Sequence, residues 1–204
     1  LDALFLCNPN NPTSQLIESK LLEEIIQKCE KTQTFCVLDE CFLPFVECGE
    51  ERSGIKLLQN PYLIILRAFT KTYAMPGIRL GYLISSNIQL LEQIKEGLQP
   101  WNVSVIAQYA GVAALELEGF LEDTRKELGI QKIFITDLLQ ECNYKILGKD
   151  GNFIFFYGED DLAKILLEDG IMIRDCSNFR GLSQGYYRIA VRNKKENQIL
   201  AQAL

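Results

Sequence analysis

The stretch RAFTKTYAMPGIRLGY, residues 67–82, decides the fold. It follows the apolar run YLIIL, residues 62–66, which has the length and composition of a buried strand. Lys71 then stands in a polar turn, and Arg79 follows after Pro76 and Gly77, two residues that mark a tight loop. The pattern predicts a buried strand that ends in a loop with two cationic side chains.

An amine close to a guanidinium suits an anion bound between them. A pyridoxal phosphate site needs this pair, because an amine condenses with the cofactor's aldehyde and a fixed cation holds its phosphate. The alternative is a surface loop whose two cations are solvated, since short motifs match by chance.

Composition places the chain among globular proteins: 204 residues, 48% hydrophobic and 24% charged. The net charge of −6 argues against nucleic acid as the main partner. No apolar run is long enough to span a bilayer, and no signal peptide is visible. The chain begins at Leu1 in an apolar run without an initiator Met, so we read it as a fragment of a longer protein.

Cysteine and histidine usage restricts the chemistry. Seven scattered cysteines, an odd number, indicate reduced thiols in a cytoplasmic protein rather than a disulfide framework. With no histidine and no CxxC pair, we expect no metal site and no Ser-His-Asp or Cys-His catalysis. Proton transfer would use Lys, Asp, Glu, Tyr, Cys or a cofactor.

Strand-like and helix-like segments alternate in the first half of the chain, which predicts a mostly parallel sheet with crossovers. The expected strands are 3–7, 34–38, 62–66 and 80–85, then 152–157, 171–174 and 186–192. The expected helices are 16–30, 54–59, 88–98, 103–117, 120–141, 160–168 and 196–204, where 103–117 and 120–141 could also be one long helix with a break near Gly119.

Three polar residues follow directly on predicted strands: Asn11, Asp39 and Lys71. Ligands of parallel sheets gather at the carboxyl ends of strands, so this shared placement predicts a site. Asp39 suits a protonated pyridinium nitrogen, although a helix N-cap would also explain it. Asn11 could bond the ring's phenolic oxygen or simply shape a turn.

Thr70 and Arg79 could hold the cofactor phosphate, the arginine through charge-assisted bonds. The alternatives are a capped turn for Thr70 and a surface ion pair for Arg79.

These residues in this order, with NPNNPT at 8–13, resemble the fold-type I pyridoxal-phosphate enzymes, the aspartate aminotransferase superfamily. Within it, the chain resembles the histidinol-phosphate aminotransferase branch and, more closely, the threonine-phosphate decarboxylase family of cobalamin biosynthesis. The segments that carry this second resemblance are DExF at 39–42, LR…TKxYAxPG at 66–77, QPW at 99–101, IRxCxN at 173–178 and YYR at 186–188.

The resemblance implies an α/β fold: a three-layer, mostly parallel sheet of the large cofactor-binding domain, incomplete here, plus a small C-terminal α+β domain. We place the large-domain part at residues 1–115 and the small domain at 116–204. It also implies pyridoxal 5'-phosphate as cofactor and a homodimer.

Roles follow residue by residue from the resemblance. Lys71 would bind the cofactor covalently and shuttle protons, while Asp39 would pair with the ring nitrogen. Asn11 would bond the phenolic oxygen or the substrate, and Thr70 and Arg79 would help bind the phosphate.

Two arginines would bind substrate: Arg188 its carboxylate and Arg174 its phosphate. The alternative is that both are strand-edge charges facing water. The position of Arg188 between the apolar neighbours Tyr187 and Ile189 favours this alternative, because strand alternation would turn Arg188 outward.

The resemblance implies a decarboxylase, a carbon–carbon lyase, that converts L-threonine O-3-phosphate to (R)-1-aminopropan-2-ol O-2-phosphate. A histidinol-phosphate-type aminotransferase is one alternative, and a catalytically incomplete fragment is another. The expected partner is a small phosphorylated amino acid.

Three departures from the family pattern bear on this reading. Phe42 stands where many aminotransferases have a tyrosine, which removes a donor to the phenolic oxygen. Ser14 replaces a glycine, which we interpret as a turn variation. The N-terminal part of the family's site is missing, so this chain alone is not expected to form a complete site.

Overall fold

The computed structural model describes all 204 residues. They form two compact units. The first unit comprises Leu1–Asn8, Ile17–Pro44 and Cys48–Leu121, and the second Pro9–Leu16, Phe45–Glu47 and Glu122–Leu204. The domain boundary between residues 115 and 116 stays a prediction.

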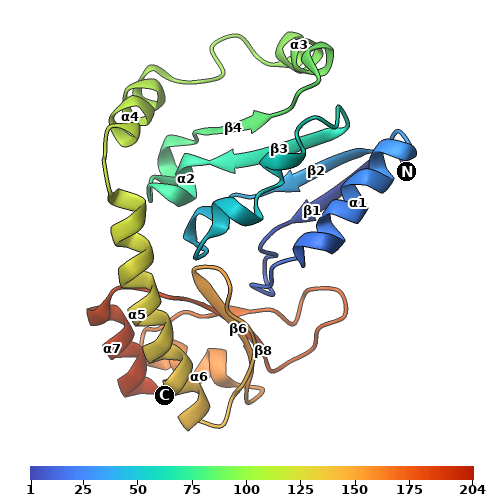
Figure 1. Ribbon diagram of the computed structural model, residues 1–204. Helices are drawn as coiled ribbons and strands as arrows, with labels where there is room; N and C mark the ends of the chain where they lie inside the picture. The colour runs from blue at the N-terminus through green and yellow to red at the C-terminus, as the bar shows by residue number, and fades with distance from the viewer. The chain divides into compact units, whose positions relative to one another are not determined.

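A four-stranded sheet forms the centre of the first unit (Figure 1). Its strands are β1 (Ala3–Cys7), β2 (Phe35–Asp39), β3 (Leu63–Ala68) and β4 (Gly81–Ile84), in that spatial order. The pairs β1–β2 and β2–β3 are parallel, and β4 runs antiparallel to β3. The mostly parallel sheet predicted from sequence is therefore confirmed.

The central strands of this unit are continuous apolar runs because both of their faces are buried in its core. Leu38, Leu63 and Ile65 are fully buried, because strands in the middle of a covered sheet have no solvated face. Helix α1 (Ser19–Lys31) crosses from β1 to β2 and packs Leu22 and Ile26 against them. Each such burial contributes roughly 1.5–3 kcal/mol.

Helix α1 begins three residues later than the sequence pattern predicts. The backbone N–H of Leu16 donates to Asp150 and that of Ile17 to Asn8, so the chain is held in a non-helical path until Glu18 caps the helix. A tertiary contact thus overrides local periodicity.

Short helical segments occupy the remaining connections of this unit. Three 3-10 helices join β2 to β3: η1 (Leu43–Phe45), η2 (Gly49–Arg52) and η3 (Gly54–Leu57). The helix predicted at 54–59 is therefore a single 3-10 turn. After β3 follow α2 (Phe69–Thr72) and η4 (Pro76–Ile78), and beyond β4 lie α3 (Ile88–Gly97) and α4 (Val105–Leu115).

The second unit has an antiparallel sheet and three helices, as expected for a small α+β domain. Its strands lie in the order β5 (Lys145–Gly148), β6 (Phe153–Tyr157), β8 (Tyr186–Ala190) and β7 (Arg174–Asp175). The helices are α5 (Phe120–Glu141), α6 (Leu162–Glu168) and α7 (Lys194–Ala203). Their shared core includes Ile135, Leu139, Ile154, Phe156 and Leu166.

Strand β5 is absent from the sequence prediction, because its four residues are too few to show alternation.

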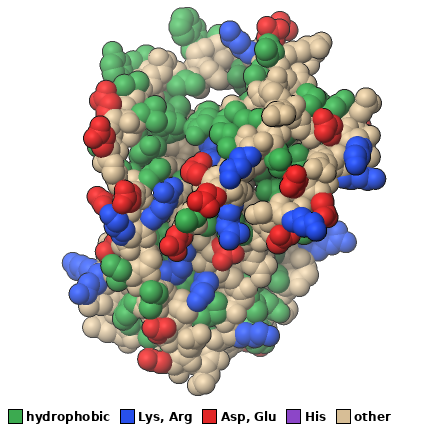
Figure 2. Space-filling view, in the orientation of Figure 1, with side chains coloured by type: hydrophobic (Ala, Val, Ile, Leu, Met, Phe, Trp, Pro, Cys, Tyr) green, Lys and Arg blue, Asp and Glu red, His purple; other side chains and the backbone are tan.

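Basic and acidic side chains are interspersed on the face drawn in Figure 2, so that face carries no extended region of one sign of charge. None of the helices has the length and apolar character needed to cross a membrane.

Candidate active site

Asp39 is the last residue of β2, where it aligns with Cys7 of β1 and Leu66 of β3. Its side chain is half-buried, and its Oδ1 accepts a hydrogen bond of 2.9 Å from the backbone N–H of Cys41. This local turn fixes one carboxylate oxygen at the carboxyl edge of the sheet.

The Cys41 thiol lies close to both Asp39 and Lys71. Burial, followed by its hydrogen bond to Asp39, raises the pKa of Cys41 from 9.0 to about 12, while the positive charge of Lys71 opposes this rise. Two residues predicted at the site therefore act electrostatically on the same neighbour.

Lys71 lies on the short helix α2, directly after β3. Its side chain is exposed, and its Nζ lies 5.6 Å from the ring centroid of Phe42. No carboxylate pairs with it, in contrast to Lys126 and Lys164. The Lys71 amine is therefore not engaged in an ion pair.

Thr70 lies in the short helix α2 after β3 and Arg79 follows η4 before β4, and the β3–β4 pairing brings these two segments together. Ala68 aligns with Gly81, and the backbone N–H of Phe69 donates to Leu80 O at 3.1 Å. Arg79 has left-handed backbone geometry (φ 58°) and is exposed, and its Nη1 donates to Pro76 O at 3.1 Å. Arg79 forms no ion pair. The surface ion pair that was the alternative for this residue is therefore absent.

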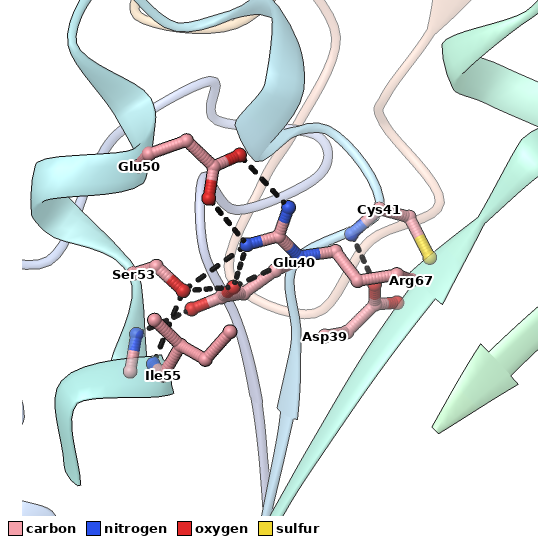
Figure 3. A network of polar contacts seen from close by, with 8 residues as sticks. Asp39, Glu40, Cys41, Glu50, Ser53, Ile55 and Arg67 are labelled. Atoms are coloured by element: carbon pink, nitrogen blue, oxygen red, sulfur yellow. Dashed lines mark hydrogen bonds and ion pairs between the residues drawn. The ribbon is translucent and has the colours of Figure 1, made fainter. Parts of the chain in front are cut away.

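A buried ionic network supports this edge of the sheet (Figure 3). Fully buried Glu40 accepts four hydrogen bonds: from Arg67 Nε (3.0 Å) and Nη2 (2.7 Å), from Ser53 Oγ (2.7 Å) and from the backbone N–H of Gly54 (2.7 Å). Arg67 also pairs with Glu50 at 3.1 Å. The network ties the end of β2 to β3 just before Thr70 and Lys71.

Sequence reasoning assigned no role to Glu40 or Arg67. The available signal was an acidic residue and a basic residue at the ends of two apolar strands, because charges in such places need partners. Figure 3 shows the Glu40 carboxylate directed at Arg67 and Ser53, and the Asp39 carboxylate at the backbone of Cys41. The two adjacent acids thus have separate environments.

In the second unit, Asn11 and Arg188 are in contact. Arg188 Nη1 donates to Asn11 Oδ1, and the guanidinium lies 5.3 Å from the ring centroid of Phe153. Tyr187 and Ile189 are buried in the core, whereas Arg188 is half-buried and, by strand alternation, faces the other side of β8. The peptide bond between Asn11 and Pro12 is cis.

Arg174 lies directly opposite Arg188 in the β7–β8 pairing. Its Nη2 donates to Asn178 Oδ1 at 3.0 Å, and its guanidinium lies 5.5 Å from the ring centroid of Phe179. Neither arginine has an ion-pair partner. Burial foremost, and also the charge of Arg174, lower the pKa of Arg188. Like charges opposite each other are unfavourable unless an anion lies between them.

The predicted site residues thus form two groups. Asp39, Thr70, Lys71 and Arg79 belong to the first unit, and Asn11, Arg174 and Arg188 to the second. The roles of these two groups in binding a cofactor and a substrate stay predictions. No group of three or more His, Cys, Asp or Glu is arranged to hold a metal ion.

The sequence matches the family "Aminotransferase class I and II" over residues 2–204. The chain therefore belongs to the class I and II aminotransferase family. A curated relative, the threonine-phosphate decarboxylase of Salmonella typhimurium, is 36% identical over 211 residues, which cover 100% of this chain and 57% of the relative. The chain thus spans little more than half the length of that protein.

Two solved structures show the same fold. The histidinol-phosphate aminotransferase from Clostridium acetobutylicum superposes with a TM-score of 0.94 at 29% identity, over 100% of this chain and 63% of that one. The L-threonine-O-3-phosphate decarboxylase from Porphyromonas gingivalis gives 0.83 at 26% identity with the same coverage. Both neighbours confirm the predicted fold class.

Proposed function

We propose that this chain is part of a pyridoxal-phosphate-dependent enzyme that decarboxylates L-threonine O-3-phosphate to (R)-1-aminopropan-2-ol O-2-phosphate in cobalamin biosynthesis. The observation that supports a substrate with two anionic groups is the pair Arg174 and Arg188, opposite each other on β7 and β8 without a carboxylate partner. The similarity to threonine-phosphate decarboxylases supports the choice of substrate. A cytoplasmic homodimer belongs to the same proposal and rests on the resemblance alone.

The donor set of the first unit fits pyridoxal phosphate. Lys71 offers an amine without an ion-pair partner, Asp39 a carboxylate with one fixed oxygen, and Thr70 and Arg79 a hydroxyl and a guanidinium on adjacent turns. When bound, the cofactor supplies an electron sink for the electron pair left at the substrate's α-carbon.

Each of these side chains then has a defined task. Lys71 anchors the cofactor and returns a proton to the α-carbon after carbon dioxide leaves. Asp39 accepts a hydrogen bond from the ring nitrogen and keeps it protonated. Thr70 and Arg79 hold the phosphate through charge-assisted bonds.

The second unit's side chains bind the substrate in this proposal. Arg188 takes the carboxylate, with Asn11 orienting the guanidinium, and Arg174 takes the phosphate. Two guanidinium groups suit two anions because each offers a planar fork of donors.

The histidinol-phosphate aminotransferase reaction is the second candidate, and the 29% sequence identity to such an enzyme from Clostridium acetobutylicum supports it. Its substrate also carries a phosphate, so the arginine pair fits both reactions. Phe42 weighs against transamination, because it replaces a hydroxyl donor that many aminotransferases use.

The full-length protein given L-threonine O-3-phosphate and no oxo acid separates the two reactions. We expect carbon dioxide release over many turnovers. A strict requirement for 2-oxoglutarate, with transfer of the amino group to it, would establish the aminotransferase instead.

Two variants test the roles of the first unit. Lys71→Ala should abolish both turnover and the covalent, borohydride-trappable attachment of the cofactor, while Lys95→Ala, on the exposed helix α3, serves as the matched control. Asp39→Asn should retain cofactor but lower kcat by a few orders of magnitude, because the ring nitrogen loses its charged partner. A cofactor adduct that borohydride traps at another lysine would contradict the assignment of Lys71.

A further inference from the structure

Ser14 has a backbone conformation that side chains rarely adopt. Its φ is 53°, in the left-handed region that favours glycine, and it is fully buried. A serine here costs free energy relative to glycine unless its side chain makes compensating contacts. Those contacts are present, so Ser14 does more than vary the turn.

The hydroxyl of Ser14 bridges two backbone groups that are far away in sequence. Its Oγ donates to Phe153 O at 2.6 Å and accepts from the backbone N–H of Gly151 at 2.9 Å. Its carbonyl oxygen accepts from the backbone N–H of Asp150 at 2.8 Å. The residue therefore joins the loop 9–16 to the start of β6, in a buried place where hydrogen bonds contribute most.

The rest of the loop is held by the same hairpin. Gln15 Nε2 donates to Leu147 O at 2.8 Å, and the backbone N–H of Leu16 donates to Asp150 Oδ2 at 2.9 Å. A side chain at Gly148 would collide with the carbonyl oxygen of Thr13, so loop and hairpin pack backbone to backbone.

The attachment of the loop 9–16 to the start of β6 affects Arg188 through two of its contacts. Asn11, three residues before Ser14, accepts a hydrogen bond from the guanidinium. Phe153, whose carbonyl accepts from Ser14, places its ring 5.3 Å from the same guanidinium. Strand β6 also pairs with β8, where Phe155 lies opposite Arg188.

We propose that Ser14 is a positioning residue, which sets the Asn11 amide and the Phe153 ring against Arg188 and so fixes the direction of the guanidinium. This role rests on the proposed function in one respect only, that the anion bound by Arg188 is the substrate carboxylate. Ser14 touches neither substrate nor cofactor and acts through Asn11 and Arg188.

The test compares Ser14→Gly with Ser14→Ala in the full-length protein. Glycine removes both Oγ bonds but suits the left-handed backbone, so the fold is retained. We expect the KM for L-threonine O-3-phosphate to rise about 5- to 10-fold with kcat within 2-fold, because the loss of both buried Oγ hydrogen bonds weakens the positioning of Arg188 and so loosens substrate binding. Ser14→Ala should show at least the same rise in KM.

Amide hydrogen exchange supplies a readout that does not depend on activity. In Ser14→Gly, the amide of Gly151 and those of residues 10–16 should exchange about 10-fold faster or more, with the helix α5 amides unchanged. Ser183→Ala, which removes an exposed hydroxyl in the same unit, is the control and should alter neither KM nor exchange.

Unchanged exchange in the loop, or a fall in kcat with an unchanged KM, would overturn the positioning role. If the parent protein does not turn over L-threonine O-3-phosphate, the proposed function fails by itself. The exchange data then still decide on Ser14, since faster loop exchange supports the attachment and unchanged exchange refutes it.

Discussion

Arg67 and Arg188 are both arginines on β-strands with little or partial exposure, yet their surroundings differ. Arg67, 9% exposed, pairs with Glu40 at 2.7 Å and with Glu50 at 3.1 Å. Arg188 contacts an amide and an aromatic ring and faces a second arginine, Arg174, across the sheet. The first cation is neutralised within the protein, and the second is available to an anion from outside.

Their pKa directions follow from these neighbours. Burial alone would lower the pKa of Arg67, but its hydrogen bonds and charge interactions with Glu50 and Glu40 outweigh that and raise it. For Arg188, burial dominates and lowers the pKa. The opposite pKa directions of the two arginines therefore follow from the presence of carboxylate partners at Arg67 and their absence at Arg188.

The largest effect is expected at the neutralised cation. Arg67→Met leaves the Glu40 carboxylate buried and unpaired, which should lower the free energy of unfolding by about 3–5 kcal/mol in urea titrations. Arg67→Met combined with Glu40→Leu should recover much of that loss, because no buried charge remains. A loss below about 1 kcal/mol for the single variant would show that the network is not structural.

Replacing Arg188, which has no carboxylate partner, should affect substrate binding more than stability. Arg188→Met should change the free energy of unfolding by less than about 1 kcal/mol, because repulsion from Arg174 is relieved as the contact with Asn11 is lost. The KM for L-threonine O-3-phosphate should rise about 10- to 150-fold, the range for losing a hydrogen bond to a charged group. Arg192→Met, at an exposed arginine near the end of β8, is the control. If Arg188→Met lowered the free energy of unfolding as much as Arg67→Met, Arg188 would be a structural cation like Arg67.

Arg174 should have a smaller effect because it is more exposed than Arg188. Arg174→Lys keeps the charge but removes the planar fork, so we expect the KM for L-threonine O-3-phosphate to rise roughly 5-fold. The preference for the phosphorylated over the free amino acid should fall in parallel. Equal affinity of the unmodified protein for threonine and its phosphate would contradict the role of Arg174.

The smallest effect is expected where both charges are exposed. Lys126 pairs with Glu122 at 3.0 Å on the surface of α5 and lowers the pKa of that carboxyl. A lowered pKa contributes stability above the unfolded value, and this contribution is lost as the pH falls through the folded value. Because solvent screens the pair, Lys126→Ala should leave the urea midpoint unchanged within error at pH 7 and at pH 3. A clear shift at pH 7 alone would show that surface pairs matter here.

Local patterns in the sequence were sufficient for much of the fold. Apolar runs predicted β1, β2 and β3, and helical periodicity predicted α5, because each signal lies within a few neighbouring residues. The same reasoning placed Asp39 and Lys71 directly after strands, since the carboxyl ends of parallel strands share an edge. Their chemical roles stay predictions.

Only the tertiary structure decided which charges are paired. Arg67 meets Glu40 across 27 residues, and Arg188 meets Asn11 across 177 residues, so no local pattern separates the structural cation from the one that is open to a ligand. The late start of α1 and the buried hydroxyl of Ser14 have the same origin. In each case the deciding hydrogen bond joins the loop 9–16 to a hairpin more than a hundred residues away in the chain, through contacts such as Leu16 to Asp150 and Ser14 to Phe153. Such contacts form only when the chain folds, because they join residues that are far apart in the sequence.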